Sequence, residues 1–343
     1  MWFLSVGSAL IDTVVRNASG YHHAGQEQSC SVGAISEHAG GMALNTACQL
    51  RGLDLGEQQP RWASIHLLAR YNAGATSSAI SSTLKALEIK PLDLGRGRMY
   101  VDGRCICVTR HGDTGNADAI RRNFYVHIPP GNQLSDDDII SILDFSDQLD
   151  SPGWVHFANL AGEPSYYSST TINVMRQLRR KKNIKISANT VGIEKGLEAL
   201  RSNHDFVQQL DWLVVNIREA QTILGDTFDT DSRLNLYDAT TATENISKHF
   251  ELLRGVAVTC GAHGSSARYG NKIAKRAIDR SLLPPRDGLI DPVGCGDAWM
   301  AGFIDSLVGE CSLDECLVRA NKMGTLALGV AGGSEPVCRR SKL

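Results

Sequence analysis

Residues 291–303 are the most informative stretch of this chain, and they read Asp-Pro-Val-Gly-Cys-Gly-Asp-Ala-Trp-Met-Ala-Gly-Phe. The glycines permit a tight turn with bare backbone N–H groups, and the apolar run that follows has helical spacing. A helix that begins at such a turn adds the positive end of its dipole, so the turn predicts an anion site. An aspartate, Asp297, would repel an anion unless it has a chemical task. We interpret the anion as a phosphoryl group in transfer, with Asp297 accepting the proton of the attacking hydroxyl; the alternative is an ordinary helix cap.

The composition is typical of a globular protein with a sizeable core. Of the 343 residues, 42% are hydrophobic and 21% are charged. The formal net charge of −2 argues against a nucleic-acid partner and against an anionic membrane surface. No apolar stretch approaches the ~20 residues of a spanning helix, so we expect no membrane segment. Nine cysteines without a secretory signal predict free thiols in a reducing compartment.

Apolar runs alternate with helical-period segments for most of the length, which predicts an α/β fold. We expect a doubly wound, mostly parallel sheet with crossover helices on both faces. The expected strands are 3–7, 64–68, 154–158, 184–188, 212–216 and 256–260. The expected helices are 43–51, 74–87, 166–181, 219–224, 245–253, 297–307 and 313–331. Residues 12–38 and 92–128 break this rhythm and predict a small antiparallel β lid, so the chain 1–343 is expected to be one domain with a lid.

Two segments near the amino end are candidates for binding a small molecule. Gly40 and Gly41 precede a helix and would let a substrate approach the backbone, with the amide of Asn45 one helical turn further on. Asp12 follows the first strand, where a carboxylate can accept hydrogen bonds from two hydroxyls. The alternatives are a glycine-rich turn and an ordinary loop aspartate.

Two further segments follow expected strands in the second half of the chain. Asn216 and Glu219 combine an amide and a carboxylate, which suits Mg²⁺ held partly through water, although the same spacing is a helix capping arrangement. Thr259, Gly261 and Gly264 could lie along a nucleotide, or could form a turn with no ligand. Because ligands of open parallel sheets bind beyond the carboxyl ends of strands, both segments are well placed for a site.

Together these motifs resemble the ribokinase-like (PfkB) carbohydrate kinase family over almost the entire length. The family signature Asp-Thr-x-Gly-Ala-Gly-Asp stands here at residues 291–297, with Gly302 and Phe303 at the proper distance. The glycine pair with its downstream Asn, the Asn-x-x-Glu motif and the Thr-x-Gly-x-x-Gly motif follow the family order. The resemblance implies an ATP-dependent phosphotransferase acting on a hydroxyl of a sugar or sugar-like molecule. An adenosine-type nucleoside kinase, or a catalytically silent relative that binds a nucleotide or sugar, is the alternative.

The resemblance also implies roles for single residues. Asp297 would be the base. The anion hole would be formed by Gly294, Cys295 and Gly296. The acceptor substrate would be held by Asp12, Gly40, Gly41 and Asn45. The ATP site would include Asn189, Thr259, Gly261, Gly264 and Asn321. Magnesium would be organised, through water, by Asn216 and Glu219.

Departures from the family pattern bear on cofactors and on substrate. Some relatives build a monovalent-cation (K⁺) site at the signature loop, but Pro292 replaces the usual Thr and removes a hydroxyl and an N–H. Met42 and Ala43 stand where ribokinases carry Lys and Gly, which argues against ribose in particular. A nicotinamide-dependent dehydrogenase would need Gly-x-Gly-x-x-Gly after the first strand, and the segment 7–10 does not supply it.

Two expectations concern partners and place. An exposed edge of the lid could pair with a second copy, giving a homodimer. The final residues Ser341, Lys342 and Leu343 form the peroxisomal import address. In a eukaryote we therefore expect binding to the import receptor and a peroxisomal or glycosomal location, and otherwise a cytoplasmic one.

Overall fold

The computed structural model describes residues 1–16, 33–72, 78–92, 100–110, 121–129, 131–162, 164–181, 183–225, 236–285 and 290–343. Parts of both expected lid segments, and the start of the expected helix 74–87, lie outside these residues.

The main sheet is mostly parallel, as predicted. Among the described residues it has nine strands in the order β13-β12-β11-β10-β9-β8-β1-β4-β5. Their bounds are β1 (Trp2–Val6), β4 (Ser64–Leu68), β5 (Lys90–Pro91), β8 (Gly153–Phe157), β9 (Ile184–Asn189), β10 (Trp212–Asn216), β11 (Gly255–Thr259), β12 (Ser265–Tyr269) and β13 (Lys272–Arg276). The antiparallel pairs of the described sheet are β11–β12 and β12–β13, and the sequence did not predict β12 or β13.

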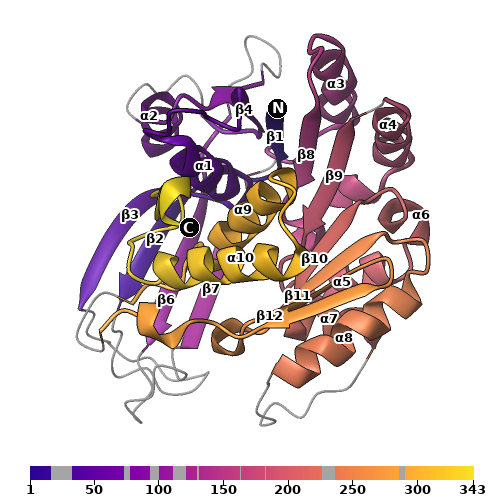
Figure 1. Cartoon of the computed structure of the whole chain (residues 1–343). Coiled ribbons are helices and arrows are strands. Elements are labelled where there is room, and N and C mark those ends of the chain that lie inside the picture. Colours follow the sequence, from indigo (N-terminus) through magenta and orange to yellow (C-terminus); the bar gives the residue numbers. More distant parts are fainter. Residues whose placement is uncertain are drawn as a thin grey trace, which may run out of the picture.

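Helices cover both faces of this sheet (Figure 1). Their bounds are α1 (Met42–Asp54), α2 (Ala79–Ala86), α3 (Asp136–Asp147), α4 (Ser169–Arg180), α5 (Glu194–Arg201), α6 (His204–Val207), α7 (Ile217–Leu224), α8 (Leu236–His249), α9 (Cys295–Val308) and α10 (Leu313–Ala327). Alternate side chains of β1 enter two different cores: Leu4 packs with residues of α3 to α8, and Phe3 packs with residues of α1, α2, α9 and α10. The near-continuous apolar strands are thus explained by burial on both faces.

A second, smaller sheet lies beside α1 (Figure 1). Its described strands are β3 (Ala34–Gly40), β2 (Leu10–Arg16), β6 (Gly103–Arg110) and β7 (Arg121–His127), in that order across the sheet. The expectation of a purely antiparallel lid was wrong, because the central pair β2–β6 is parallel. Parallel pairing needs a long connection between the two strands, and the chain from β3 through α1, β4, α2 and β5 provides it.

Several helix boundaries differ from those expected. Helix α4 begins three residues late because Ser168 caps it, its Oγ accepting from the N–H of Thr171 at 3.1 Å. Helix α8 spans 236–249 instead of 245–253, since Ala239, Ala242 and Ile246 are buried at helical spacing despite a threonine-rich sequence. Helix α3, with a capping box at Ser135, was missed, as were α5 and α6. No described helix is long and apolar enough to cross a membrane.

Candidate active site

The first turn of α9 has the open backbone that an anion site requires. Gly294 is the N-cap, with a left-handed φ of 78°, and a Cβ there would lie 2.3 Å from the Cα of Gly333. Gly296, two residues on, has no atom within 4 Å of the position that a Cβ would take. The turn is therefore packed closely on one side and open on the other, with Cys295 partly exposed between the glycines. This geometry fits the predicted anion hole.

Asp297 lies in the same turn and is joined to the amino-terminal part of the chain. Its Oδ2 accepts a hydrogen bond of 2.8 Å from Nδ2 of Asn45, which lies 252 residues away in the first turn of α1. Both side chains are buried, and Oδ1 of Asn45 has no hydrogen-bond partner among the described residues. Gly333 makes room for this amide, because a Cβ there would lie 2.2 Å from its Nδ2. The sequence reasoning did not select Gly333, although the pair of glycines at 332 and 333 could have indicated a close approach.

Asp12 is the second buried carboxylate of the site. It lies in β2, and its carboxylate fills the space beside Gly40, where a Cβ would lie 1.9 Å from Oδ2. It also accepts a hydrogen bond from the backbone of Gly41, whose φ of 95° is one that glycine adopts readily. The predicted acceptor residues, Asp12, the two glycines and Asn45, are therefore brought together around the start of α1.

Both aspartates ionise with difficulty. Burial raises the pKa of Asp297 to about 7; the hydrogen bond from Asn45 opposes this rise, and the charge of Asp12 adds to it. Burial also raises the pKa of Asp12 to about 7, with the charge of Asp291 adding and the Gly41 hydrogen bond opposing. A carboxylate whose pKa lies near neutral pH suits proton transfer, because it can accept a proton and release it again.

The predicted magnesium residues form a capping box at the start of α7. Oδ1 of Asn216 accepts from the N–H of Glu219 at 2.9 Å, and Oε2 of Glu219 accepts from the N–H of Asn216 at 2.8 Å. The hydroxyl of Thr190, which the sequence reasoning did not select, donates to the same oxygen at 2.5 Å. Burial raises the pKa of Glu219, while these donors oppose the rise. The capping alternative is thus observed, and within the described residues no hydrogen bond reaches Oε1 of Glu219.

Amide side chains mark the neighbouring strand ends. Asn189 ends β9 and is buried, and its Oδ1 accepts from the backbone N–H of Asn159 at 3.2 Å. Asn159 follows β8 with a φ of 65°, which is uncommon outside glycine. The parallel register places these strand ends along one edge of the sheet. Asn159 was not predicted, because its backbone conformation has no signal in the sequence.

Some of the residues predicted to bind the nucleotide are exposed, and others are already packed or hydrogen-bonded within the protein. Thr259 ends β11, and Gly261 is exposed, with open space where a Cβ would stand. Gly264, with a φ of 100°, allows the β11–β12 turn to pack against the backbone of Arg276. Asn321 is buried, and its Oδ1 accepts from the hydroxyl of Ser265 and from Nε1 of Trp299. Its amide therefore fixes the β12–β13 hairpin to α9 and α10.

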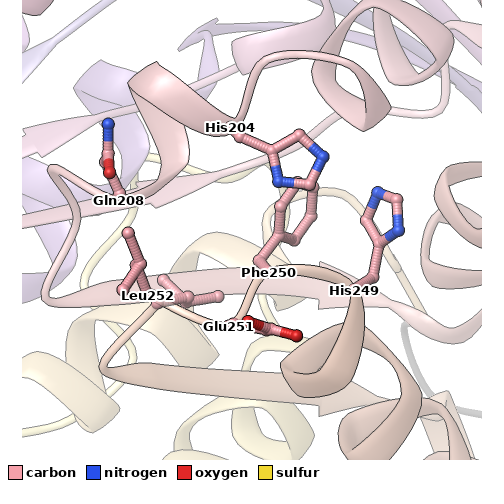
Figure 2. Close-up of a pocket in the computed structure, with 7 residues that line it drawn as sticks. His204, Gln208, His249, Phe250, Glu251 and Leu252 are labelled. Carbon is pink, nitrogen blue, oxygen red and sulfur yellow. The ribbon is translucent and has the colours of Figure 1, made fainter.

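No group of three or more His, Cys, Asp or Glu side chains among the described residues is arranged to hold a metal ion. A hollow of about 320 Å³ lies elsewhere, lined by His204, Gln208, His249 and residues 250–253 (Figure 2). These residues precede β10 and β11, so the hollow lies at the amino ends of strands whose carboxyl ends carry the motifs. We do not assign it to the site.

Comparison with known proteins identifies the family. The model of the pfkB family of carbohydrate kinases matches residues 117–339, which is more than half of the chain. The chain therefore belongs to the pfkB carbohydrate kinase family, as its motifs predicted.

Solved structures show the same fold at low identity. Ribokinase from Cryptococcus neoformans var. grubii serotype A in complex with ADP matches at a TM-score of 0.70 and 17% identity, covering 99% of this chain and 97% of that chain. Phosphofructokinase-2 from Escherichia coli in complex with potassium matches at a TM-score of 0.67 and 16% identity, covering 99% of this chain and 96% of that chain. Adenosine kinase from Sinorhizobium meliloti matches at a TM-score of 0.66 and 16% identity, covering 97% of this chain and 95% of that chain. The ribokinase-like fold is thereby confirmed.

Proposed function

We propose that this chain is an ATP-dependent kinase that phosphorylates a hydroxyl of a sugar or sugar-like small molecule. The observation that carries the proposal is the buried Asp297 in the first turn of α9, bonded to Asn45 and next to the open backbone of Gly296. Kinase members of the family need a base beside an anion hole, and these residues supply both. The relatives named for ribokinase and adenosine kinase activity are consistent with an acceptor that carries hydroxyl groups.

The acceptor would be held by groups that have hydrogen-bonding capacity to spare. Oδ1 of Asn45 has no partner in the described part of the chain and can accept from a hydroxyl. The carboxylate of Asp12 can accept a second one, since glycines at positions 40 and 41 leave its approach free of side chains. Two such contacts orient the reacting hydroxyl toward Asp297 and lower the entropic cost of the transfer.

Transfer itself requires one proton acceptor and stabilisation of negative charge. The acceptor oxygen forms its bond to the γ-phosphorus, the bond to the ADP oxygen breaks, and the hydroxyl proton passes to Asp297. Backbone N–H groups of Gly294, Cys295 and Gly296 then face the developing charge. A pKa of about 7 lets Asp297 take the proton near neutral pH and later lose it to solvent.

The residues present fit a nucleotide with magnesium. Gly261 offers open space at the end of β11, Asn189 ends β9, and the buried carboxylate of Glu219 lies between them at the end of β10. Magnesium, when bound, neutralises phosphate charge, and Glu219 would hold it through water because a few contacts suffice for this ion. The amide of Asn321 already donates to the carbonyl of Arg276 at the end of β13. Asn321 would therefore act on an adenine indirectly, by holding the β12–β13 hairpin in place beside it.

A coupled assay of ADP formation over pentoses, hexoses, keto-sugar acids and nucleosides tests the proposal. We expect turnover with one sugar-like compound and none with the others. Turnover with adenosine alone would establish the nucleoside-kinase alternative. Nucleotide binding by calorimetry without turnover on any acceptor would identify a silent relative and overturn the proposal.

Magnesium use is tested through Glu219. The change Glu219→Gln keeps an oxygen that can cap α7 but removes the charge. We expect the Mg²⁺ concentration for half-maximal rate to rise about tenfold while the thermal midpoint changes little. Glu251→Gln, an exposed carboxylate beyond the site, is the matched control and should leave both quantities unchanged.

We also propose that a homodimer forms through the second sheet. Ile35, Phe124 and Val126 lie in its two edge strands and are 62%, 50% and 55% exposed. Exposed apolar side chains at the edge of a sheet favour pairing with a second copy. Light scattering after gel filtration should give twice the chain mass, and Phe124→Asp should give the monomer mass; a monomeric wild type contradicts the proposal.

Peroxisomal import is the remaining proposal. The tail lies on the body: the N–H of Ser341 donates to Glu57 at 2.8 Å, and Nζ of Lys322 donates to the carbonyl of Lys342 at 2.5 Å. A receptor that reads a flexible end would have to release these contacts and the packing of Leu343 against the core. A fluorescent fusion in yeast should reach peroxisomes, and the same fusion without Leu343 should stay in the cytosol. Identical distribution of the two fusions would refute import.

A further inference from the structure

The carboxylate that begins the signature loop is already paired with a cation from within the protein. Asp291 is fully buried, and its Oδ2 accepts from Nη2 of Arg16 and from the N–H of Gly332, both at 3.0 Å. Its Oδ1 accepts from the N–H of Val293 at 3.0 Å. Arg16 is 14% exposed in its side chain and comes from the last position of β2, 275 residues away. Three donors thus fix this loop, and one of them is a full positive charge.

Arg16 belongs to one face of β2 that contacts the site at three points. Alternate residues of a strand point the same way, so Asp12, Val14 and Arg16 share a face. Asp12 lies at the acceptor site, Val14 packs against Val293 in a small buried cluster with Cys107, and Arg16 pairs with Asp291. The second sheet is therefore joined to the signature loop by an apolar contact and an ion pair.

These residues do not fit a monovalent cation beside Asp291. An alkali ion needs several oxygen ligands and a net negative environment, and Pro292 has removed one hydroxyl. Both carboxylate oxygens of Asp291 already accept hydrogen bonds, and the guanidinium would repel a second cation at this distance. A potassium ion, which the E. coli relative binds, therefore has no place next to this carboxylate.

We propose that the guanidinium of Arg16 supplies the positive charge that an alkali ion supplies in potassium-bound relatives, so that this enzyme works without K⁺. This inference rests on the proposed kinase function. Arg16 is a positioning residue: it holds Asp291, and through Asp291 the loop whose N–H groups face the phosphoryl group. Because Arg16 and Asp12 share one strand face, the charge that orders the anion hole is carried by the same strand as the acceptor site.

The first test compares chloride salts of K⁺, Na⁺ and tetramethylammonium at equal ionic strength, with Mg·ATP and the acceptor found in the assay above. We expect turnover and thermal midpoint of the wild type to differ by less than about twofold and about one degree across the salts. A K⁺ activation above about fivefold, or a midpoint several degrees higher in K⁺ than in tetramethylammonium, would overturn the proposal. The thermal midpoint needs no acceptor, so absence of kinase activity in every salt would count against the proposed function alone.

The second test removes the internal cation. Arg16→Ala leaves a buried carboxylate without its charge partner, so we expect turnover to fall at least about tenfold and the thermal midpoint to drop. Added K⁺ or methylguanidinium should recover part of both losses in this variant and leave the wild type unchanged. Unchanged turnover in Arg16→Ala, or a loss that neither cation recovers, contradicts the assignment.

A conservative variant covers the case in which Arg16→Ala does not fold. Arg16→Lys keeps the charge, so we expect a folded enzyme whose turnover is within about threefold of wild type and stays indifferent to K⁺. Appearance of K⁺ dependence in Arg16→Lys would show that charge at this position is not what replaces the ion.

Discussion

Two helices of this enzyme begin with the same spacing and use it differently. In α7, Asn216 is the N-cap and Glu219 occupies the third helical position; in α9, Gly294 is the N-cap and Asp297 occupies that position. Glu219 accepts a hydrogen bond from the backbone of its own cap, whereas Asp297 accepts one from Asn45 on a distant helix. Glycine has no side chain to make the reciprocal cap, and α9 has no side-chain cap hydrogen bond.

The difference separates a carboxylate bonded within its own helix start from one that is bonded to a distant helix. A capped carboxylate has two local donors, Thr190 and the Asn216 backbone, that oppose the rise of its pKa. The uncapped Asp297 has one side-chain donor and the neighbouring charge of Asp12, and its pKa reaches about 7. The third helical position is thus tied to its own cap in α7 and to a distant helix in α9, and we propose the base role for the second carboxylate alone.

The largest expected effect follows from Asp297→Asn. Turnover should fall by about 10³-fold because the proton has no acceptor, while ATP affinity stays nearly unchanged. The folded-state pKa is raised from its ordinary value, so ionisation costs stability as pH rises through about 7. At alkaline pH the free energy of unfolding of the variant should therefore be roughly 1–3 kcal/mol higher than that of the wild type. This difference should vanish toward acid pH, where Asp297 of the wild type is protonated. Full turnover would remove Asp297 from the proposed role.

Next in size is the matched pair Gly296→Ala and Gly294→Ala. A methyl group at position 296 enters open space, so the first variant should fold normally yet lose about 10²-fold in turnover by crowding the phosphoryl group. A methyl group at position 294 meets backbone at a left-handed φ, so the second should lose stability as well. Thermal unfolding and initial rates, measured for both variants, distinguish the two effects. Equal losses of stability would contradict the inference that the turn is open at Gly296 and closely packed at Gly294.

The pH profile gives a smaller effect. Raised carboxyl pKa values near 7 at Asp297 and Asp12 predict that kcat/KM falls by about tenfold or more for each unit of pH below about 6. The loss runs toward acid because the raised pKa keeps both groups protonated there. Asn45→Ala removes the donor that holds the pKa of Asp297 down, so its profile should shift to higher pH. A flat wild-type profile from about pH 5.5 to pH 8 would contradict both pKa shifts.

The smallest effect belongs to the capped helix. Asn216→Ala removes the cap of α7 and should lower the free energy of unfolding by about 1 kcal/mol, measured by urea denaturation. Asn216→Asp keeps an oxygen that can accept from Glu219 and should lose less. An activity loss in Asn216→Ala as large as that of Asp297→Asn would show that the two helix starts are not as different as proposed.

Most of the fold was predictable because its signals are local. The strands 64–68 and 212–216 were predicted to the residue, since short, mostly apolar runs buried on both faces leave a clear pattern. The β12–β13 hairpin was missed because Ser265–Tyr269 and Lys272–Arg276 are polar edge strands, whose burial depends on α8 and α10. The parallel pairing of β2 with β6 was also beyond the sequence, because register between distant strands has no local pattern.

For the candidate site, the chain by itself determined which residue types take part: the Gly-x-Gly-Asp turn, the paired glycines with Asn45, and the family to which the protein belongs. These depend on backbone freedom and on short spacing, which a sequence displays directly. Only the tertiary structure decided which oxygens are committed and which are free, because the contacts of Asp297 with Asn45 and of Asp291 with Arg16 join residues more than 250 positions apart. Burial at the first of these contacts raises the pKa of Asp297, and burial is a property of the folded chain alone.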